Sequence, residues 1–327
     1  MALTRLLLRP LSWIWASATA RRIARGHPVD VGAPVISVGN LTMGGTGKTP
    51  VVRALLARLR DRGLTAAGLS RGYGGSEAGP LQVNPAEHSA AQVGDEPLML
   101  AADGPMFIAR DRAAGAATAV AAGAQVVVMD DGHQNPAVRK VLSLIVVDGE
   151  TRDGEWPFGD GAVFPAGPMR EPLRAGLARA DAVVIVMPDG LECPDRELLA
   201  LFGDLPVLTV RIEADGPPPS GPLMGFAGVA KPWKVERALQ AAGADLIDFA
   251  PYPDHATLSP ADLRFLRDRA DMLGARLVTT EKDFARLSPA DRAGIFTFAI
   301  RARFEDEHAL DALLDKAISG AGRPADI

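Results

Sequence analysis

Short apolar segments alternate with segments of helical periodicity in the chain that follows Pro34. The apolar runs predict buried strands, and the 3.6-residue spacing predicts helices that pack on them. Strands are expected near residues 35–38, 65–70, 126–130, 142–147 and 182–187, and helices near 50–62, 95–102 and 110–122. This alternation predicts an α/β domain with a parallel sheet covered on both faces, which we assign to residues 28–205.

A second series of apolar runs and helical patterns follows Pro206 and predicts a smaller α/β domain over residues 206–327. Its strands are expected near 207–213, 222–227, 245–250, 276–280 and 296–303, and its helices near 233–241, 260–273 and 307–319. The segment 214–221 is rich in Pro and Gly and is typical of a linker. The strands at 207–213 and 296–303 are expected to pair and form a hinge.

The first 27 residues combine Leu, Ile and Trp with five arginines and no acidic residue. Arg9 and Pro10 interrupt the apolar residues, and the run from Leu11 to Ala20 is too short to cross a bilayer. A basic segment with tryptophans is suited to the surface of an anionic membrane, so residues 1–27 are predicted to form an amphipathic helix that lies there. Packing on the protein core and a signal peptide are the two alternative interpretations.

Composition narrows the class of protein. The chain has 327 residues, of which 47% are hydrophobic, which is sufficient for two globular domains. Its single cysteine excludes an intramolecular disulfide. The net charge is −5, and because the first 27 residues carry +5, the remainder carries −10. The negative net charge of the residues that follow position 27 argues against nucleic acid as a partner.

A glycine-rich loop follows the expected strand at 35–38 and leads into the next helix. Such a loop directs backbone N–H groups toward a phosphate, and the helix dipole adds positive charge. The expected nucleotide-binding residues are Met43, Gly44, Gly45, Thr46, Gly47, Lys48 and Thr49. In such a loop the lysine, here Lys48, is expected to contact the β/γ-phosphates, and the hydroxyl of Thr49 is expected to bind Mg²⁺. Thr42 stands where the strict pattern has glycine, so an ordinary glycine-rich connection is the alternative.

A second motif consists of an apolar strand at 126–129 that ends in Asp130 and Asp131. Behind a phosphate loop, such a strand end predicts a magnesium site, although the same pattern alone indicates a simple turn. His133 adds a hydrogen-bonding side chain at this strand end. Because the carboxyl ends of parallel strands meet at one rim, residues 39–48, 70–74 and 130–133 are expected to converge there.

For several charged residues outside these two motifs, the spacing alone does not decide between a functional and a structural role. Asp95 precedes a helical pattern, where an acid also stabilises the helix dipole. His255 lies in a polar loop and needs a partner to take part in catalysis. Arg71 and Arg170 are suited to binding anions, with surface salt bridges as the alternative.

Eight strings occur in a fixed order along almost the whole sequence, namely SVGNLTMGGTGKTPVV, SRGYGG, GDEPLML, VVMDDGHQN, GPMREP, FAGVAKPWKVERAL, PDHATLS and TTEKDFARL. In these strings the chain resembles the tetraacyldisaccharide 4′-kinases of lipid A biosynthesis. The resemblance implies a P-loop α/β/α domain, a smaller α/β/α domain joined by a two-stranded linker, and a membrane-associated N-terminal helix. It also implies transfer of the γ-phosphoryl group of ATP to the 4′-hydroxyl of a tetraacylated disaccharide 1-phosphate.

The resemblance assigns roles to particular residues. It implies a general base at Asp95, a catalytic histidine at His255, and a magnesium site at Asp130 and Asp131, with catalytic Lys48 in the phosphate loop. Further substrate contacts are expected from Asn40, Arg71, Tyr73, His133, Arg170 and Glu171. The chain departs from the family at Ala230-Lys231, where a Gly-Asn or similar pair is more usual.

The resemblance also implies the setting of the reaction. The cofactors are ATP and Mg²⁺, and the partners are the lipid A disaccharide 1-phosphate and the cytoplasmic face of the inner membrane. Neither nucleic acid nor an obligate protein partner is expected. Two other functions fit the sequence less well. A partitioning ATPase or GTPase switch is disfavoured because Met43 replaces a second lysine and Asn-Lys-x-Asp is absent. A soluble small-metabolite kinase leaves the N-terminus unexplained.

Overall fold

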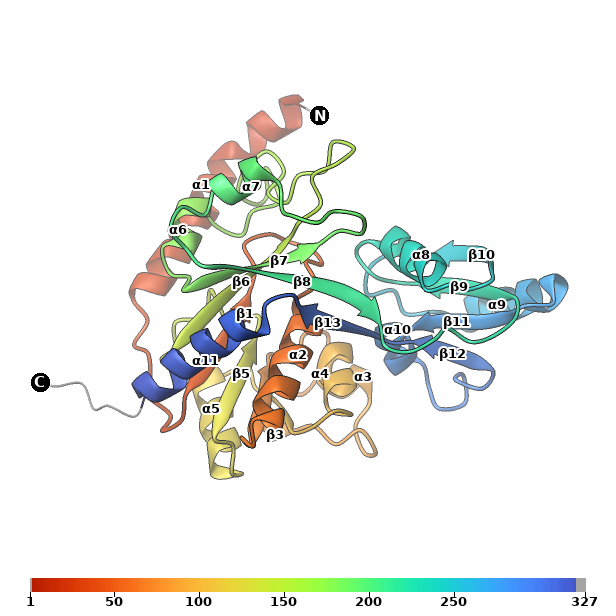
Figure 1. Cartoon of the computed structure of the whole chain (residues 1–327), viewed down its shortest axis with the longest axis horizontal. Helices are drawn as coiled ribbons and strands as arrows, with labels where there is room; N and C mark the ends of the chain where they lie inside the picture. Colours follow the sequence, from red (N-terminus) through yellow and green to blue (C-terminus); the bar gives the residue numbers. More distant parts are fainter. Residues whose placement is uncertain (1, 322–327) are drawn as a thin grey trace, which may run out of the picture.

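A nine-stranded sheet forms the larger part of the computed structural model, which describes residues 2–321 (Figure 1). The strand order is β13-β8-β7-β6-β1-β5-β2-β4-β3. These strands are β1 (Val35–Gly39), β2 (Ala66–Ser70), β3 (Leu81–Gln82), β4 (Met106–Ile108), β5 (Val126–Asp130), β6 (Leu142–Asp148), β7 (Ala182–Met187), β8 (Val207–Ala214) and β13 (Ile300–Phe304). All neighbours are parallel except β3 with β4 and β8 with β13, so the predicted parallel α/β architecture is confirmed.

Strand β1 lies in the interior of this sheet, between β5 and β6. Its five residues are all buried, as are those of β2 and β5, because helices cover both faces of the sheet. Parallel pairing brings the carboxyl ends of β1, β5 and β6 to the same rim. The loops that leave these three strands therefore begin side by side.

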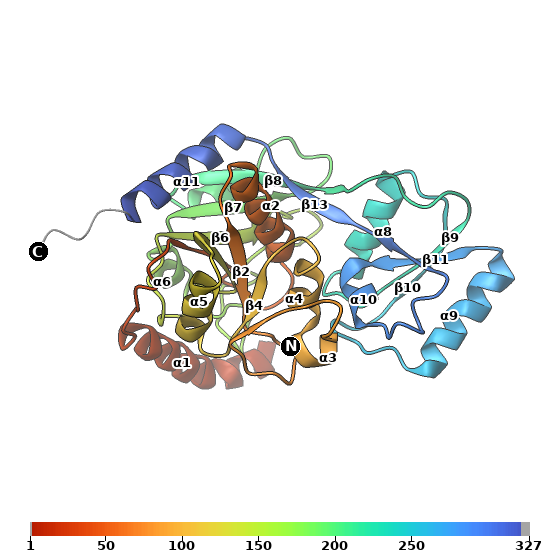
Figure 2. The ribbon, with the colours of Figure 1, turned by 90° about the horizontal axis from the view of Figure 1, so that it is seen from below.

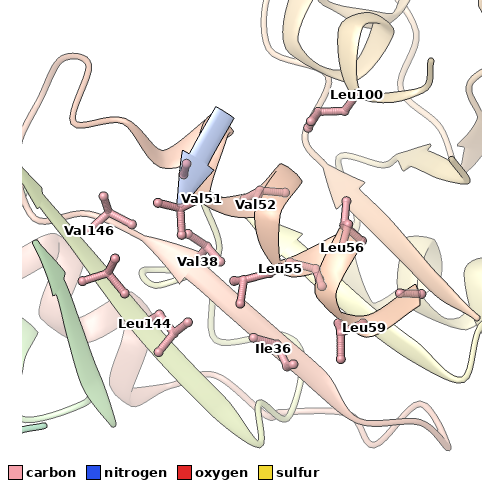
Figure 3. Packing of buried hydrophobic residues seen from close by; sticks show 14 of the residues in the cluster. Ile36, Val38, Val51, Val52, Leu55, Leu56, Leu59, Leu100, Leu144 and Val146 are labelled. Carbon is pink, nitrogen blue, oxygen red and sulfur yellow. The ribbon is translucent and has the colours of Figure 1, made fainter. Parts of the chain in front are cut away.

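Helices cover the sheet on both faces. α2 (Lys48–Asp61) contributes five buried aliphatic residues to a core that it shares with β1 and β6 (Figure 3), and α11 (Glu307–Ala321) joins the same core. Each fully buried Val or Leu of this kind contributes about 1.5–3 kcal/mol. α5 (Arg112–Ala121) packs in the core of the other face. The shorter helices are α3 (Ala90–Val93), α4 (Asp95–Leu100), α6 (Leu173–Leu177) and α7 (Arg196–Ala200).

A second sheet has four parallel strands in the order β10-β9-β11-β12. The strands are β9 (Leu223–Ala227), β10 (Leu246–Pro251), β11 (Arg276–Thr280) and β12 (Ile295–Phe298), and the helices are α8 (Pro232–Ala241), α9 (Pro260–Leu273) and α10 (Glu281–Arg286). These elements, residues 223–298, are called the smaller unit below. The nine-stranded sheet and the helices packed on it are called the larger unit. The smaller unit lies beside the larger one (Figure 2).

The expected strand at 296–303 is in fact two strands that belong to different sheets. Phe298 of β12 packs in the smaller unit, whereas Ala302 and Phe304 of β13 pack in the core of the larger unit. β13 pairs antiparallel with β8, as the predicted hinge requires. The division between the sheets nevertheless differs from a boundary at residue 206, because β8, β13 and α11 all belong to the larger unit.

α1 (Ala2–Ala24) is one continuous helix that runs through Pro10. It packs on the segment 160–170, where the Trp15 indole donates to the Arg170 carbonyl at 3.1 Å and Ser12 accepts from the Ala166 N–H at 3.0 Å. Other apolar side chains face solvent, among them Trp13 at 74% exposure. None of the described helices is long and apolar enough to cross a membrane. Figure 2 shows α1 and α11 on opposite sides of the larger sheet.

Candidate active site

The glycine-rich loop lies between the end of β1 and the start of α2. Gly44 and Gly47 have φ angles of 103° and 84°, which residues other than glycine rarely adopt. A Cβ at Gly47 would lie only 3.0 Å from Val186 Cγ2, which is tighter than an ordinary van der Waals contact. The buried amide of Asn40 donates to the Gly44 carbonyl at 3.4 Å and to Thr46 Oγ1 at 3.3 Å. Asn40, expected to bind substrate, instead holds the loop in shape.

Asp131 connects the phosphate loop to the segment that carries Arg170. Its carboxylate accepts two hydrogen bonds from Arg170 Nη1, at 2.8 and 2.9 Å, and lies 3.6 Å from Lys48 Nζ. Burial alone would raise the pKa of Asp131, but the charges of Lys48 and Arg170 outweigh it and lower the pKa. Arg170 also donates to the Thr42 carbonyl at 3.0 Å. Arg170, expected at the substrate, therefore braces Asp131 and the loop.

Asp130 differs from the adjacent Asp131 in its hydrogen bonding and in the direction of its pKa shift. It ends β5, is buried, and its Oδ1 has no hydrogen-bond partner within residues 2–321. Burial, with the charge of Glu96 acting in the same direction, raises the pKa of Asp130 to about 7. Such an unpaired buried carboxylate beside a phosphate loop fits a cation ligand, since Mg²⁺ is usually held by one or two carboxylates together with substrate phosphates.

The described residues contain no cluster of three or more His, Cys, Asp or Glu side chains that could hold a metal by themselves. Thr49 lies at the second position of α2, directly after Lys48.

Asp95 begins α4 and is buried at the boundary between the two units. Its Oδ2 accepts a hydrogen bond from Arg286 Nε at 2.8 Å and lies 4.0 Å from Lys282 Nζ, and both cations belong to α10. Burial would raise the pKa of Asp95, but Lys282 and Arg286 outweigh it and lower the pKa. Asp95 is therefore ionised at neutral pH.

His255 meets Asp95 across the boundary. Its Nδ1 lies 3.3 Å from Asp95 Oδ2, and its ring packs edge-on against Tyr73 with centroids 5.6 Å apart. The φ angle of His255 is 59°, an uncommon backbone conformation for a residue other than glycine. The structure thus brings together two residues, 160 positions apart in sequence, that were both expected to take part in catalysis.

Two of the expected substrate-binding residues are instead buried in the protein interior. His133 Nδ1 lies 2.9 Å from Ser143 Oγ and its Nε2 lies 3.0 Å from the Gly176 carbonyl. Burial lowers the pKa of His133 to about 4. Glu171 is buried and pairs with Arg179 at 2.7 Å. Both side chains are buried and already have protein partners in this structure, so their contact with substrate stays a prediction.

Arg71 and Tyr73, the other two expected substrate contacts, are exposed. Tyr73 is 69% exposed and approaches only His255 among aromatic side chains of the described part of the chain. These two residues are therefore available to a ligand at the rim.

Three features of the site were not singled out from the sequence. Lys282 and Arg286 surround Asp95, although their string TTEKDFARL contributed to the resemblance. Arg112 is buried near Asp130, and its Nε has no partner within the described chain. Lys231 and Lys234 of the smaller unit both reach Asp148, at 3.0 and 2.7 Å. A charged residue in a helical pattern normally indicates a solvated face, so spacing alone could not identify them.

The fold and the loop define the class of protein, a P-loop α/β nucleotide-binding protein with a second α/β unit beside its phosphate loop. A family model described as "Tetraacyldisaccharide-1-P 4'-kinase" matches residues 4–319. The chain belongs to this tetraacyldisaccharide 4′-kinase family.

Relatives named Tetraacyldisaccharide 4′-kinase match over nearly their full length. The protein from Caulobacter vibrioides is 64% identical over 311 residues, covering 95% of this chain and 93% of the relative. The protein from Phenylobacterium zucineum is 63% identical over 314 residues, covering 96% and 94%. The crystal structure of LpxK from Aquifex aeolicus in complex with ATP superimposes with a TM-score of 0.76 at 24% identity, covering 96% of this chain and 99% of that one. This last likeness establishes a shared fold.

Proposed function

We propose that this chain transfers the γ-phosphoryl group of ATP to the 4′-hydroxyl of a tetraacylated disaccharide 1-phosphate, a step of lipid A biosynthesis. Membership of the 4′-kinase family supports the reaction and its substrate. The observation that carries the chemistry is the pairing of Asp95 with His255 at the boundary between the units. A kinase needs such a group at its acceptor, because the attacking hydroxyl must be oriented and must lose its proton during the transfer.

The phosphate loop holds the donor. Backbone N–H groups of residues 43–49 cradle the phosphates, and Lys48 contacts the β/γ-phosphates, as in other P-loop proteins. Thr49 and Asp130 would hold Mg²⁺, with Asp131 beside them. When bound, the cation neutralises charge on the transferred group. Arg170 keeps Asp131 ionised and in place, as their two hydrogen bonds indicate.

Asp95, with His255 beside it, accepts the proton of the sugar hydroxyl. The low pKa of Asp95 makes it a weak base. A weak base suffices because phosphoryl transfer passes through a loose transition state, in which the attacking oxygen has formed little bond and still carries little charge. His255 orients the carboxylate and stabilises the proton after transfer.

The parts of the chain divide these tasks. Residues 28–205 bind the nucleotide, and the smaller unit supplies His255 and the two cations around Asp95. Residues 1–27 dock the enzyme on the cytoplasmic face of the inner membrane. Exposed Leu11, Trp13 and Ile14 together with the arginines of α1 support this docking, since apolar and basic groups combine in interfacial helices.

Substitution of Asp95 tests the chemistry. Asp95→Asn should lower kcat by about 100- to 10,000-fold, the range for loss of a general base. Binding of ATP should stay within about twofold, because Asp95 is not assigned to the nucleotide. The assay measures ADP release with ATP, Mg²⁺ and detergent-dispersed tetraacyldisaccharide 1-phosphate. Turnover equal to that of the unsubstituted enzyme would remove Asp95 from the mechanism.

A further inference from the structure

The short helix α10 connects the smaller unit to the larger one through charged side chains. It is six residues long and packs against α4. Three of its side chains pair with opposite charges of the larger unit, in the pairs Glu281 with Arg53 at 2.7 Å, Lys282 with Glu96 at 2.9 Å, and Arg286 with Asp95 at 2.8 Å. We call these three pairs the α10 clasp. Arg53 belongs to α2, the helix that begins at the phosphate loop.

Arg286 is the most buried cation of the clasp, with only 11% of its side chain exposed. Its Nη1 donates to the Gly228 carbonyl at 2.9 Å and to Asp283 Oδ1 at 2.7 Å, which holds the guanidinium in one orientation. Its Nη2 lies 3.2 Å from His255 Nδ1, and its Nε donates to Asp95 Oδ2. A single guanidinium therefore contacts both members of the proposed acid–base pair.

The same geometry sets up a competition for the proton position on His255. Its Nδ1 lies 3.3 Å from Asp95, which only accepts, and 3.2 Å from Arg286, which only donates. One imidazole nitrogen cannot donate and accept at once. The histidine therefore either accepts from Arg286 or donates to Asp95. Arg286 thus influences which tautomer of His255 faces the carboxylate.

We propose that Arg286 is a positioning residue of the phosphoryl transfer, which aligns Asp95 with His255 while the Glu281–Arg53 pair fixes α10 relative to the phosphate-loop helix. The inference rests on the proposed function of Asp95 and His255. Arg286 acts through these two groups and need not touch the substrate. The clasp explains how a base carried by one unit and a histidine carried by the other keep a fixed separation.

Substitution of Arg286 should therefore affect turnover more than binding. Arg286→Gln should lower kcat by about 10- to 1,000-fold while the KM for ATP changes little, because misalignment weakens the transition state and leaves the phosphate loop intact. Arg286→Lys keeps the charge but loses the fork of donors, and it should retain an intermediate kcat. Glu281→Gln, which is remote from the reacting groups, should cost about 3- to 30-fold.

The pH profile separates positioning from a general structural role. Asp95 faces Arg286, Lys282 and His255, with Glu96 as its neighbour in the chain. Loss of the Arg286 charge raises the pKa of Asp95, so the acidic limb of kcat/KM should move to higher pH in Arg286→Gln. The Lys variant, which keeps the charge, should show a smaller displacement.

Arg269→Gln is the matched control. Arg269 pairs with Asp248 at 2.9 Å entirely within the smaller unit, so this variant should keep the kcat of the unsubstituted enzyme. ATP binding and thermal unfolding verify the fold of each variant. If Arg286→Gln does not fold, Arg286→Lys and Glu281→Gln decide the question. An unchanged kcat in Glu281→Gln would then overturn the role of the clasp.

Asp95→Asn in the same assay separates the two levels of inference. If Asp95→Asn is fully active, the proposed function of Asp95 fails. If Asp95→Asn loses activity while folded Arg286→Gln keeps it, only the role of Arg286 fails. The double variant should be no worse than Asp95→Asn alone, since both changes remove one function. Losses that multiply would overturn a shared role.

Discussion

Replacing Asp130 by asparagine should stabilise the enzyme at neutral and alkaline pH even though it abolishes activity. Burial raises the pKa of Asp130 from an ordinary value of 3.8 to about 7. At a pH between these two pKa values, Asp130 keeps its proton in the folded protein but has lost it in the unfolded chain. The unfolded chain therefore binds fewer protons, and stability falls as the pH rises through this window. An asparagine side chain at this position carries no such charge and avoids the cost.

The magnitude follows from the difference between the two pKa values. At about 1.4 kcal/mol for each pH unit, the ionised form of Asp130 costs at most about 4 kcal/mol of folding free energy above pH 7. The thermal midpoint of Asp130→Asn, relative to the unsubstituted protein, should therefore increase from pH 5 to about pH 7 and level off toward pH 8. The measurement uses nucleotide-free protein in a chelator, because a bound cation would stabilise the carboxylate.

Asp131→Asn is the matched control because the neighbouring carboxyl has the opposite behaviour. Lys48 and Arg170 outweigh burial and lower the pKa of Asp131, so its stabilising contribution is present above the ordinary pKa and is lost as the pH falls. Asp131→Asn should thus be less stable than the unsubstituted protein at pH 8. The reasoning is refuted if Asp130→Asn shows no gain in midpoint between pH 5 and pH 8.

Three further predictions concern activity and location. Lys48→Ala should lower kcat by about 100-fold or more in a folded protein, because positioned charge dominates phosphoryl transfer, and ADP release measures it. Trp13→Glu should weaken binding to anionic vesicles in a flotation assay and raise the KM for lipid more than that for ATP; unchanged binding would restrict α1 to packing on residues 160–170. His255→Ala combined with Asp95→Asn should cost far less in kcat than the product of the two single losses, and multiplicative losses would mean separate roles.

Most of the larger sheet was predictable because its strands are buried on both faces. A buried parallel strand is a continuous apolar run, and all five runs predicted within residues 28–205 are strands in the structure. Two short strands, β3 and β4, were missed because runs of two and three residues give no periodic signal. The division at 295–304 was missed for another reason. Its two halves share one apolar pattern, and only the separate cores that receive Phe298 and Phe304 distinguish them.

The site was predictable where chemistry imposes a local pattern, and less so elsewhere. Glycines, Lys48 and the two aspartates are adjacent in sequence to the elements that position them. Arg286 gave no signal, because its importance depends on Asp95, 191 residues away. His133 shows the converse, since a polar residue next to a functional motif can form hydrogen bonds within the protein interior. Its hydrogen bonds to Ser143 and Gly176 depend on the folded arrangement of three segments.

Product analysis tests the central claim most directly. The enzyme is incubated with ATP, Mg²⁺ and detergent-dispersed tetraacyldisaccharide 1-phosphate, and the lipid is examined by mass spectrometry and phosphorus NMR. We predict one new phosphate monoester on the 4′-oxygen, formed in equal amount to ADP and only when lipid is present. Hydrolysis of ATP at the same rate without lipid, or a phosphate at another position of the sugar, would contradict the account.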